Sequence, residues 1–155
     1  MKGKVRGIMI LLGFAALGGL AYLAAYHWQA QQARQYSRAP AVEDCDLRAG
    51  ACRRAVAGGW VSLSITPRTI PLMQPLHLSV EIDGLVAHAV QVEIRGLNMD
   101  MGLNRTLLQG IQDGRWEGET ILPICSQRRM QWEAAVRLDG DGRFEVPFVF
   151  DTRRE

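Results

Sequence analysis

The chain has 155 residues, enough for one ordinary domain, and a formal net charge of only +2 from 18 basic and 16 acidic residues. Lys2, Lys4 and Arg6 precede an apolar stretch, and without them the chain carries 15 arginines against 16 acidic residues. This near balance of charges provides no basic surface for a nucleic acid, and no aromatic residues are interleaved in a basic groove. Both observations argue against a nucleic-acid-binding protein.

Residues 8–28 form an apolar segment without an ionised side chain. As an α-helix it spans roughly 30 Å, the thickness of the hydrocarbon core of a bilayer. We therefore predict one transmembrane helix, with residues 1–7 in the cytoplasm because basic residues favour that side. A cleaved signal peptide starts in the same way, but its apolar core is usually about 7–15 residues and ends at a small-x-small site, which is missing here.

This orientation predicts a single-pass protein of a bacterial-type inner membrane, with everything after the helix in the periplasm. Residues 29–58 are expected to be a linker, in which Pro40 ends any helix that continues out of the membrane. Cys45 and Cys52 lie close together in this stretch and are expected to form a disulfide in an oxidising compartment. A metal-binding pair is the alternative, but CxxC spacing and companion histidines are missing.

Residues 59–155 show the alternation of apolar and polar residues that is typical of half-buried β-strands. Seven such segments are separated by Gly, Pro and Asp, at residues 61–66, 76–82, 88–95, 106–111, 116–122, 130–138 and 144–150. The pattern predicts an all-β domain, an antiparallel immunoglobulin-like sandwich of about seven strands, preceded by the transmembrane helix. Another small all-β fold, such as a barrel, fits the same pattern.

The third and fourth strand segments are joined by Gly-Leu-Asn-Met-Asp-Met-Gly, residues 96–102, which we call the Met bend. Thioether sulfur is a soft ligand that selects Cu(I) over hard ions. Two more soft ligands would be needed beside Met99 and Met101. Cys125 and Met130 follow the fifth strand, whose loop can lie at the same end of a sandwich. The predicted copper ligands are therefore Met99, Met101, Cys125 and Met130.

Packing is the competing interpretation of the same residues. Methionine fills irregular gaps in cores, and Met130 continues the buried alternation of its strand. Cys125, with no activating partner in the sequence, is typical of an inert buried thiol. His88 is expected to be buried or half-buried with its strand, and His77 to lie on the surface.

The sequence offers little for catalysis. Asp139 and Asp141 are the only two carboxylates placed on a common loop, and they belong to Asp-Gly-Asp-Gly, which predicts a hairpin turn. No serine stands in a nucleophile-elbow setting. We therefore expect neither an enzyme nor a small-molecule substrate.

An N-terminal anchor, a small β-sandwich, the G-x-N-M-x-M-G bend, the W-x-G step at Trp116 and the W-x-x-x-V-x-L strand at Trp132 together resemble the FixH-like and YtkA-like membrane-anchored domains. The resemblance covers residues 60–150. It implies copper handling and the assembly of haem-copper oxidases. The chain departs from the pattern in lacking histidines near the Met bend.

Two functions follow as hypotheses. The first is a membrane-anchored periplasmic accessory protein that binds Cu(I) and assists the assembly of a respiratory or other envelope complex. The second is an interaction module of the cell envelope that needs no metal and uses the Met bend and the anchor helix as contact surfaces. The distances between the four sulfur atoms discriminate between them.

Overall fold

The computed structural model describes residues 13, 17–28, 35–41 and 45–153. The chain divides into two units, Met1–Gln35 and Tyr36–Glu155. In the first unit residues 17–28 are helical, and the described residues contain no helix that is both long and apolar enough to cross a membrane. Much of the predicted transmembrane segment, residues 8–12 and 14–16, lies outside the described residues, as do residues 1–7.

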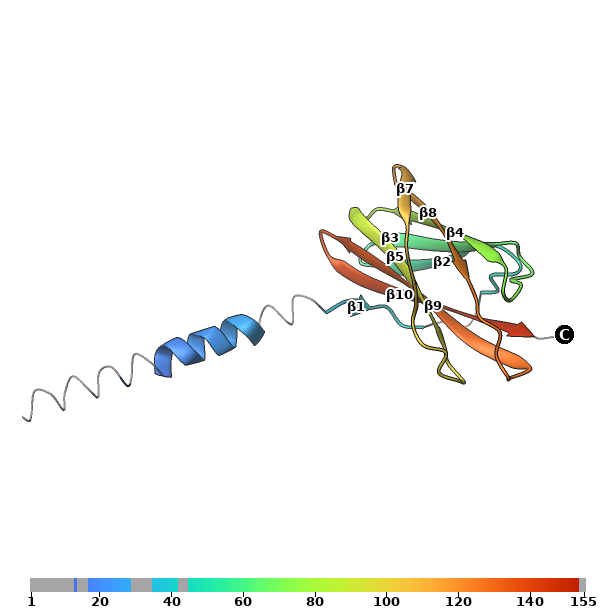
Figure 1. Ribbon diagram of the computed structural model, residues 1–155. Coiled ribbons are helices and arrows are strands. Elements are labelled where there is room, and N and C mark those ends of the chain that lie inside the picture. The colour runs from blue at the N-terminus through green and yellow to red at the C-terminus, as the bar shows by residue number, and fades with distance from the viewer. Residues whose placement is uncertain (1–12, 14–16, 29–34, 42–44, 154–155) are drawn as a thin grey trace, which may run out of the picture. The chain divides into compact units, whose positions relative to one another are not determined.

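The second unit is an all-β sandwich of two five-stranded sheets (Figure 1). The β9 sheet has the order β1 (Ser37–Arg38), β10 (Arg143–Arg153), β9 (Arg129–Gly140), β5 (Ala87–Gly96), β6 (Asn104–Leu107). The β3 sheet has the order β2 (Cys52–Val56), β3 (Gly59–Thr66), β4 (Pro75–Asp83), β8 (Arg115–Ile121), β7 (Gln109–Gln112). All neighbouring strands are antiparallel except β1 and β10. The prediction of an all-β, mainly antiparallel sandwich is confirmed.

The described residues form ten strands rather than about seven. β1 and β2 lie within residues 29–58, the stretch interpreted as a linker. The segment 106–111 contributes to two strands, because the chain passes from the β9 sheet to the β3 sheet at Leu108. Leu108 is buried, and its N–H donates to the carbonyl oxygen of Val90 at 2.9 Å.

The core lies between the inward faces of the two sheets. Alternate residues of β9 and β10 face inward, including Trp132 and Phe148, which are each 1% exposed. Facing them are the inward residues of β3 and β4: Val61, Leu63, Ile65, Leu76, Leu78 and Val80. Burying each such aliphatic side chain contributes roughly 1.5–3 kcal/mol. The indole N–H of Trp132 donates to the hydroxyl of Thr152 at 2.8 Å, so the one polar atom of that side chain is satisfied.

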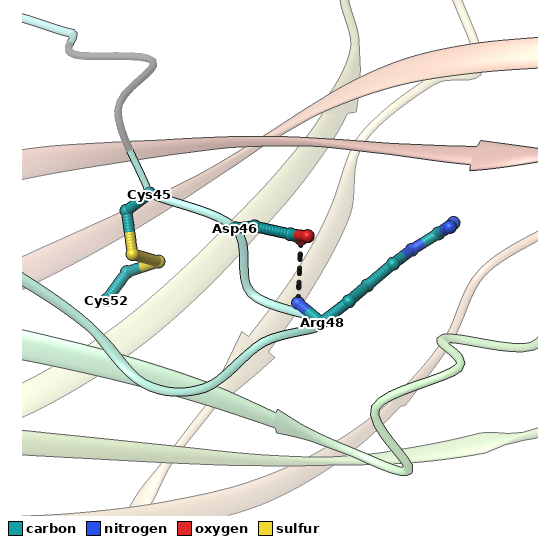
Figure 2. Close-up of a disulfide and its surroundings, with 4 residues drawn as sticks. All are labelled: Cys45, Asp46, Arg48 and Cys52. Atoms are coloured by element: carbon teal, nitrogen blue, oxygen red, sulfur yellow. Dashed lines mark hydrogen bonds between the residues drawn. A yellow bond between two sulfur atoms is a disulfide. The ribbon is translucent and has the colours of Figure 1, made fainter.

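The predicted disulfide between Cys45 and Cys52 is confirmed (Figure 2). It closes a loop that leads into the first residue of β2, and the Asp46 carboxylate in this loop accepts the backbone N–H of Arg48 at 2.9 Å. The guanidinium of Arg48 donates to the carbonyl oxygen of Asp151 in β10 at 2.6 Å. The disulfide loop is therefore fastened to both sheets.

His88 differs from the sequence expectation, because it is exposed rather than buried. The register between β5 and β9 shifts between Ala87 and Ala89, and this β-bulge makes His88 the extra residue. The alternation that predicted a buried His88 holds only beyond the bulge, from Val90 onward.

Changing Thr152 to Val tests the buried Trp132–Thr152 hydrogen bond. The change keeps the volume but leaves the indole N–H without an acceptor, and we expect the free energy of unfolding to fall by about 1–3 kcal/mol. The measurement is denaturant unfolding of the full chain. In a Trp132→Phe background the same change should have almost no effect, since there is no N–H to satisfy; an equal loss in both backgrounds would contradict this role.

Candidate functional site

The Met bend is fastened onto the beginning of β9. The N–H of Leu97 donates to the carbonyl oxygen of Gln131 at 2.8 Å. The Asn98 side chain bridges the same strand, because its amide donates to the carbonyl oxygen of Arg129 and its oxygen accepts the N–H of Gln131, both at 3.0 Å. The loop after β8, residues 122–128, leads directly into this part of β9, so both loops lie at one end of the sandwich (Figure 1).

This arrangement brings Met99 and Cys125 into contact. The Cys125 Sγ lies 3.1 Å from the Met99 Sδ, a distance at which the thiol donates to the thioether. Cys125 is only 6% exposed and its sulfur also accepts the N–H of Gln127 at 3.4 Å, whereas Met99 is 38% exposed. Two of the four predicted ligands are therefore adjacent, one buried and one open to solvent.

Met101 and Met130 both pack against Gly96. A β-carbon built on Gly96 would stand 2.8 Å from the Met130 Cε and 3.4 Å from the Met101 Cγ, and it would overlap the carbonyl oxygen of Met99. Met130 is 2% exposed and belongs to the core, as the packing interpretation expected. Met101 is half-buried against the same core. Glycine at position 96 thus allows three methionines to approach one point of the backbone.

The Asp100 carboxylate has a structural role in the Met bend. Asp100 Oδ1 accepts the N–H of Gly102 at 2.8 Å, and Gly102 has a φ of +71°, a conformation that glycine adopts without strain. Asp100 therefore closes the turn that carries Met99 and Met101. Among the described residues no three His, Cys, Asp or Glu side chains gather as a metal-binding group.

The sulfur pair must open to hold a metal ion. With metal–sulfur bonds of about 2.3 Å, a tetrahedral site separates two sulfurs by roughly 3.8 Å. The observed 3.1 Å is shorter, so Met99 or Cys125 has to move by a fraction of an ångström. Met99 is the one that can do so, because it is 38% exposed, against 6% for Cys125, and lines an open hollow of about 720 Å³ together with Leu97 and Leu103.

Gly96 and Asn98 are the two site residues whose roles the sequence reading missed. The close approach of Gly96 to the Met99 carbonyl oxygen and to the Met101 and Met130 side chains comes from tertiary packing, which a local pattern does not show. No local signal marks the role of Asn98, because the backbone groups that it bonds, at Arg129 and Gln131, lie 31 and 33 residues later in the chain.

Comparison of the chain with protein-family models, with curated proteins and with solved structures finds no match.

Changing Gly96 to Ala tests the close approach of the bend to β9. The new methyl group would overlap the Met99 carbonyl oxygen and press on Met130, and we expect a loss of about 1–3 kcal/mol in the free energy of unfolding. The thiol of Cys125 should also react faster with a thiol reagent, because the bend that covers it shifts.

Gly50→Ala is the matched control, since a β-carbon at Gly50 meets no atom within 4 Å. Equal stability and equal thiol reactivity in the Gly96 and Gly50 variants would contradict the proposed packing of the bend.

Proposed function

We propose that this protein is a membrane-anchored periplasmic accessory protein whose immunoglobulin-like domain binds Cu(I) and assists the assembly of a respiratory or other envelope complex. Met99 and Cys125 provide the first two ligands, and Met101 and Met130, which both pack against Gly96, are the candidates for the further two. The observation that carries the proposal is the 3.1 Å contact between Cys125 Sγ and Met99 Sδ.

The chemistry of the donor set favours Cu(I). Thiolate and thioether are soft donors, which suit Cu(I) better than Mg²⁺, Ca²⁺ or Mn²⁺. Binding requires Cys125 to lose its proton, and the single positive charge of Cu(I) then balances the thiolate in a nearly buried position. A divalent ion at the same place would leave an uncompensated positive charge.

Three features support the location and the role. The apolar segment at residues 8–28 with basic residues before it fits an anchor whose C-terminal side is periplasmic. The Cys45–Cys52 disulfide fits an oxidising compartment. The resemblance of residues 60–150 to FixH-like and YtkA-like domains links such a domain with copper and oxidase assembly.

The proposal is tested by titrating the full-length chain in detergent, with the Cys45–Cys52 disulfide intact and oxygen excluded, with Cu(I) against a colorimetric Cu(I) chelator. We expect Met99→Leu and Cys125→Ala each to lower the affinity at least tenfold, because each removes one sulfur donor with little change in shape. Met73→Leu is the matched control, since Met73 is 62% exposed and lies outside the Met bend. If the wild type does not bind Cu(I), or if all four proteins bind it with equal affinity, the copper proposal is wrong.

The second candidate function is a metal-independent interaction module, and exposed apolar residues in the Met bend and directly after it favour this function. Leu97 is 47% and Leu103 is 69% exposed, and both line the hollow beside Met99. A photo-crosslinker at Leu103 should then capture a partner in membranes whether or not a copper chelator is present. A crosslinker at Ile111 of β7, which is 58% exposed, serves as the control. Equal labelling from both positions would refute this function.

A further inference from the structure

The outer faces of the two sheets differ in how their polar side chains are arranged. On the β9 sheet, three nearly buried carboxylates are each paired with an arginine: Glu93, Glu133 and Glu145. On the β3 sheet, the outward positions in the middle of β3 and β4 are half-buried serines: Ser62, Ser64 and Ser79. Because a serine side chain is short, the outer face of the β3 sheet is low and polar in its middle.

A hollow of about 390 Å³ lies on this face, where β3 begins and β4 ends. This volume is in the range of roughly 300–1,000 Å³ that is typical of sites for small ligands. A row of neighbouring residues crosses four strands in the hollow, from β2 to β8: Arg53, Ser62, Glu81 and Arg115. The hollow is therefore built on the paired strands of the sheet and not on a loop alone.

The turn between β7 and β8 forms one wall of the hollow. The N–H of Ile82 in β4 donates to the carbonyl oxygen of Gly114 at 2.7 Å. Gly114 has a φ of +74°, and a β-carbon at this position would stand 2.5 Å from the Ile82 carbonyl oxygen, so the close approach requires glycine. The turn thereby holds Gln112 and Asp113 beside β4, where both line the hollow.

Trp60 gives the hollow an aromatic surface. It lies on the outward side of β3 and is 43% exposed. The guanidinium carbon of Arg53 lies 4.6 Å from the centre of the Trp60 ring, and its Nη2 lies 3.3 Å from Asp83 Oδ2. Arg53 and Asp83 thus hold one side of the indole, and much of its surface still remains open to a ligand.

Several polar side chains of the hollow are available to a ligand. Within the described part of the chain, the side chains of Glu81, Gln112 and Asp113 have no hydrogen-bond or ion-pair partner. Arg115 is fixed by Glu117, to which its Nε donates at 2.8 Å. The hollow therefore offers hydrogen-bond donors and acceptors next to an open indole ring.

We propose that this hollow binds a neutral glycan of N-acetylated amino sugars, with one sugar ring stacked on Trp60. One side of a pyranose ring presents C–H groups that pack against an aromatic ring, while its hydroxyls both donate and accept hydrogen bonds. The hydroxyls and the acetamide N–H are donors for Glu81 and Asp113. A sugar that carries carboxylates or phosphates fits less well, because carboxylates outnumber guanidinium groups in the hollow.

A protein partner matches this hollow less closely than a glycan does. The centre of a protein interface is apolar and poor in charged residues. The large apolar side chains that line this hollow are Trp60 and Ile82, and Ile82 is only 8% exposed. The other large side chains of the lining are charged or carry an amide, which suits a ligand with many hydroxyls.

The proposal is tested by NMR titration of the full-length chain, in a detergent without a sugar headgroup, with N-acetylchitotetraose, a linear tetramer of N-acetylglucosamine. We expect the indole N–H signal of Trp60 to shift, while that of the buried Trp132 does not. Trp60→Ala should lower the affinity at least tenfold because stacking is lost, and Trp60→Phe, which keeps a ring, should retain most of it. Glu81→Gln should lower the affinity at least threefold, because a charge-assisted hydrogen bond becomes a neutral one.

The matched controls are Glu119→Gln and Ile111→Ala. Both residues are exposed in the β3 sheet and lie outside the hollow, so both variants should bind the tetramer like the wild type. A tetramer of galacturonic acid, which is anionic, should bind at least tenfold more weakly than N-acetylchitotetraose.

Three results would overturn the proposal: no shift of the Trp60 signal, equal affinity in wild type and Trp60→Ala, or equal affinity for the neutral and the anionic tetramer. If N-acetylchitotetraose does not bind and a photo-crosslinker at Ser62 captures a protein in membranes, this face is a protein contact. The readout involves neither copper nor the four sulfur residues, so failure here is separate from failure of the proposed function.

Discussion

The register between β9 and β10 is the constraint on which the rest of the domain depends. These strands pair over eleven consecutive positions, from Arg143 with Asp139 to Arg153 with Arg129. Because successive side chains point to opposite faces, this one register sends Trp132 and Phe148 into the core and Glu133 and Glu145 to the outer face. A slip by one residue would exchange the two sets, placing carboxylates in the core and aromatic rings in water.

The same hairpin positions two features at its opposite ends. At the beginning of β9, Arg129 and Gln131 hold Asn98 and so fix the Met bend beside Met130. Near the turn, Asp139 and Glu145 hold the edge strand β1 and the residue before it through Arg38 and Tyr36. The core between them is continuous, so both ends are built on one rigid element rather than on separate loops. The positions of the two sulfur atoms are therefore fixed by β9, although Met99 itself lies in a bend.

Much of this domain could be predicted from sequence, because most strands bury one face and alternate accordingly. The features that alternation missed lack a buried face of their own or depend on distant residues. β1 has only two residues. β2 has the sequence Cys-Arg-Arg-Ala-Val, in which the arginines obscure the alternation of apolar and polar residues. The change of sheet at Leu108 leaves no local signal, because the sequence does not show which of the two successive residues Leu107 and Leu108 is buried. Likewise, the contact of Cys125 with Met99 was expected only as a possible meeting of two loops, since loop paths are fixed by tertiary bonds such as those of Asn98.

Packing and metal binding need not be alternatives for the same sulfurs. Met130 is 2% exposed and fills the core, while Met99, at 38% exposed, lies at the surface end of the same group. The buried Cys125 thiol donates a hydrogen bond to the Met99 thioether, and this contact brings no charge into the core. Under the proposed function, Cu(I) replaces that proton between the same two atoms and again leaves no net charge. The buried end then stays fixed by the core, and the exposed end can open to let the ion in.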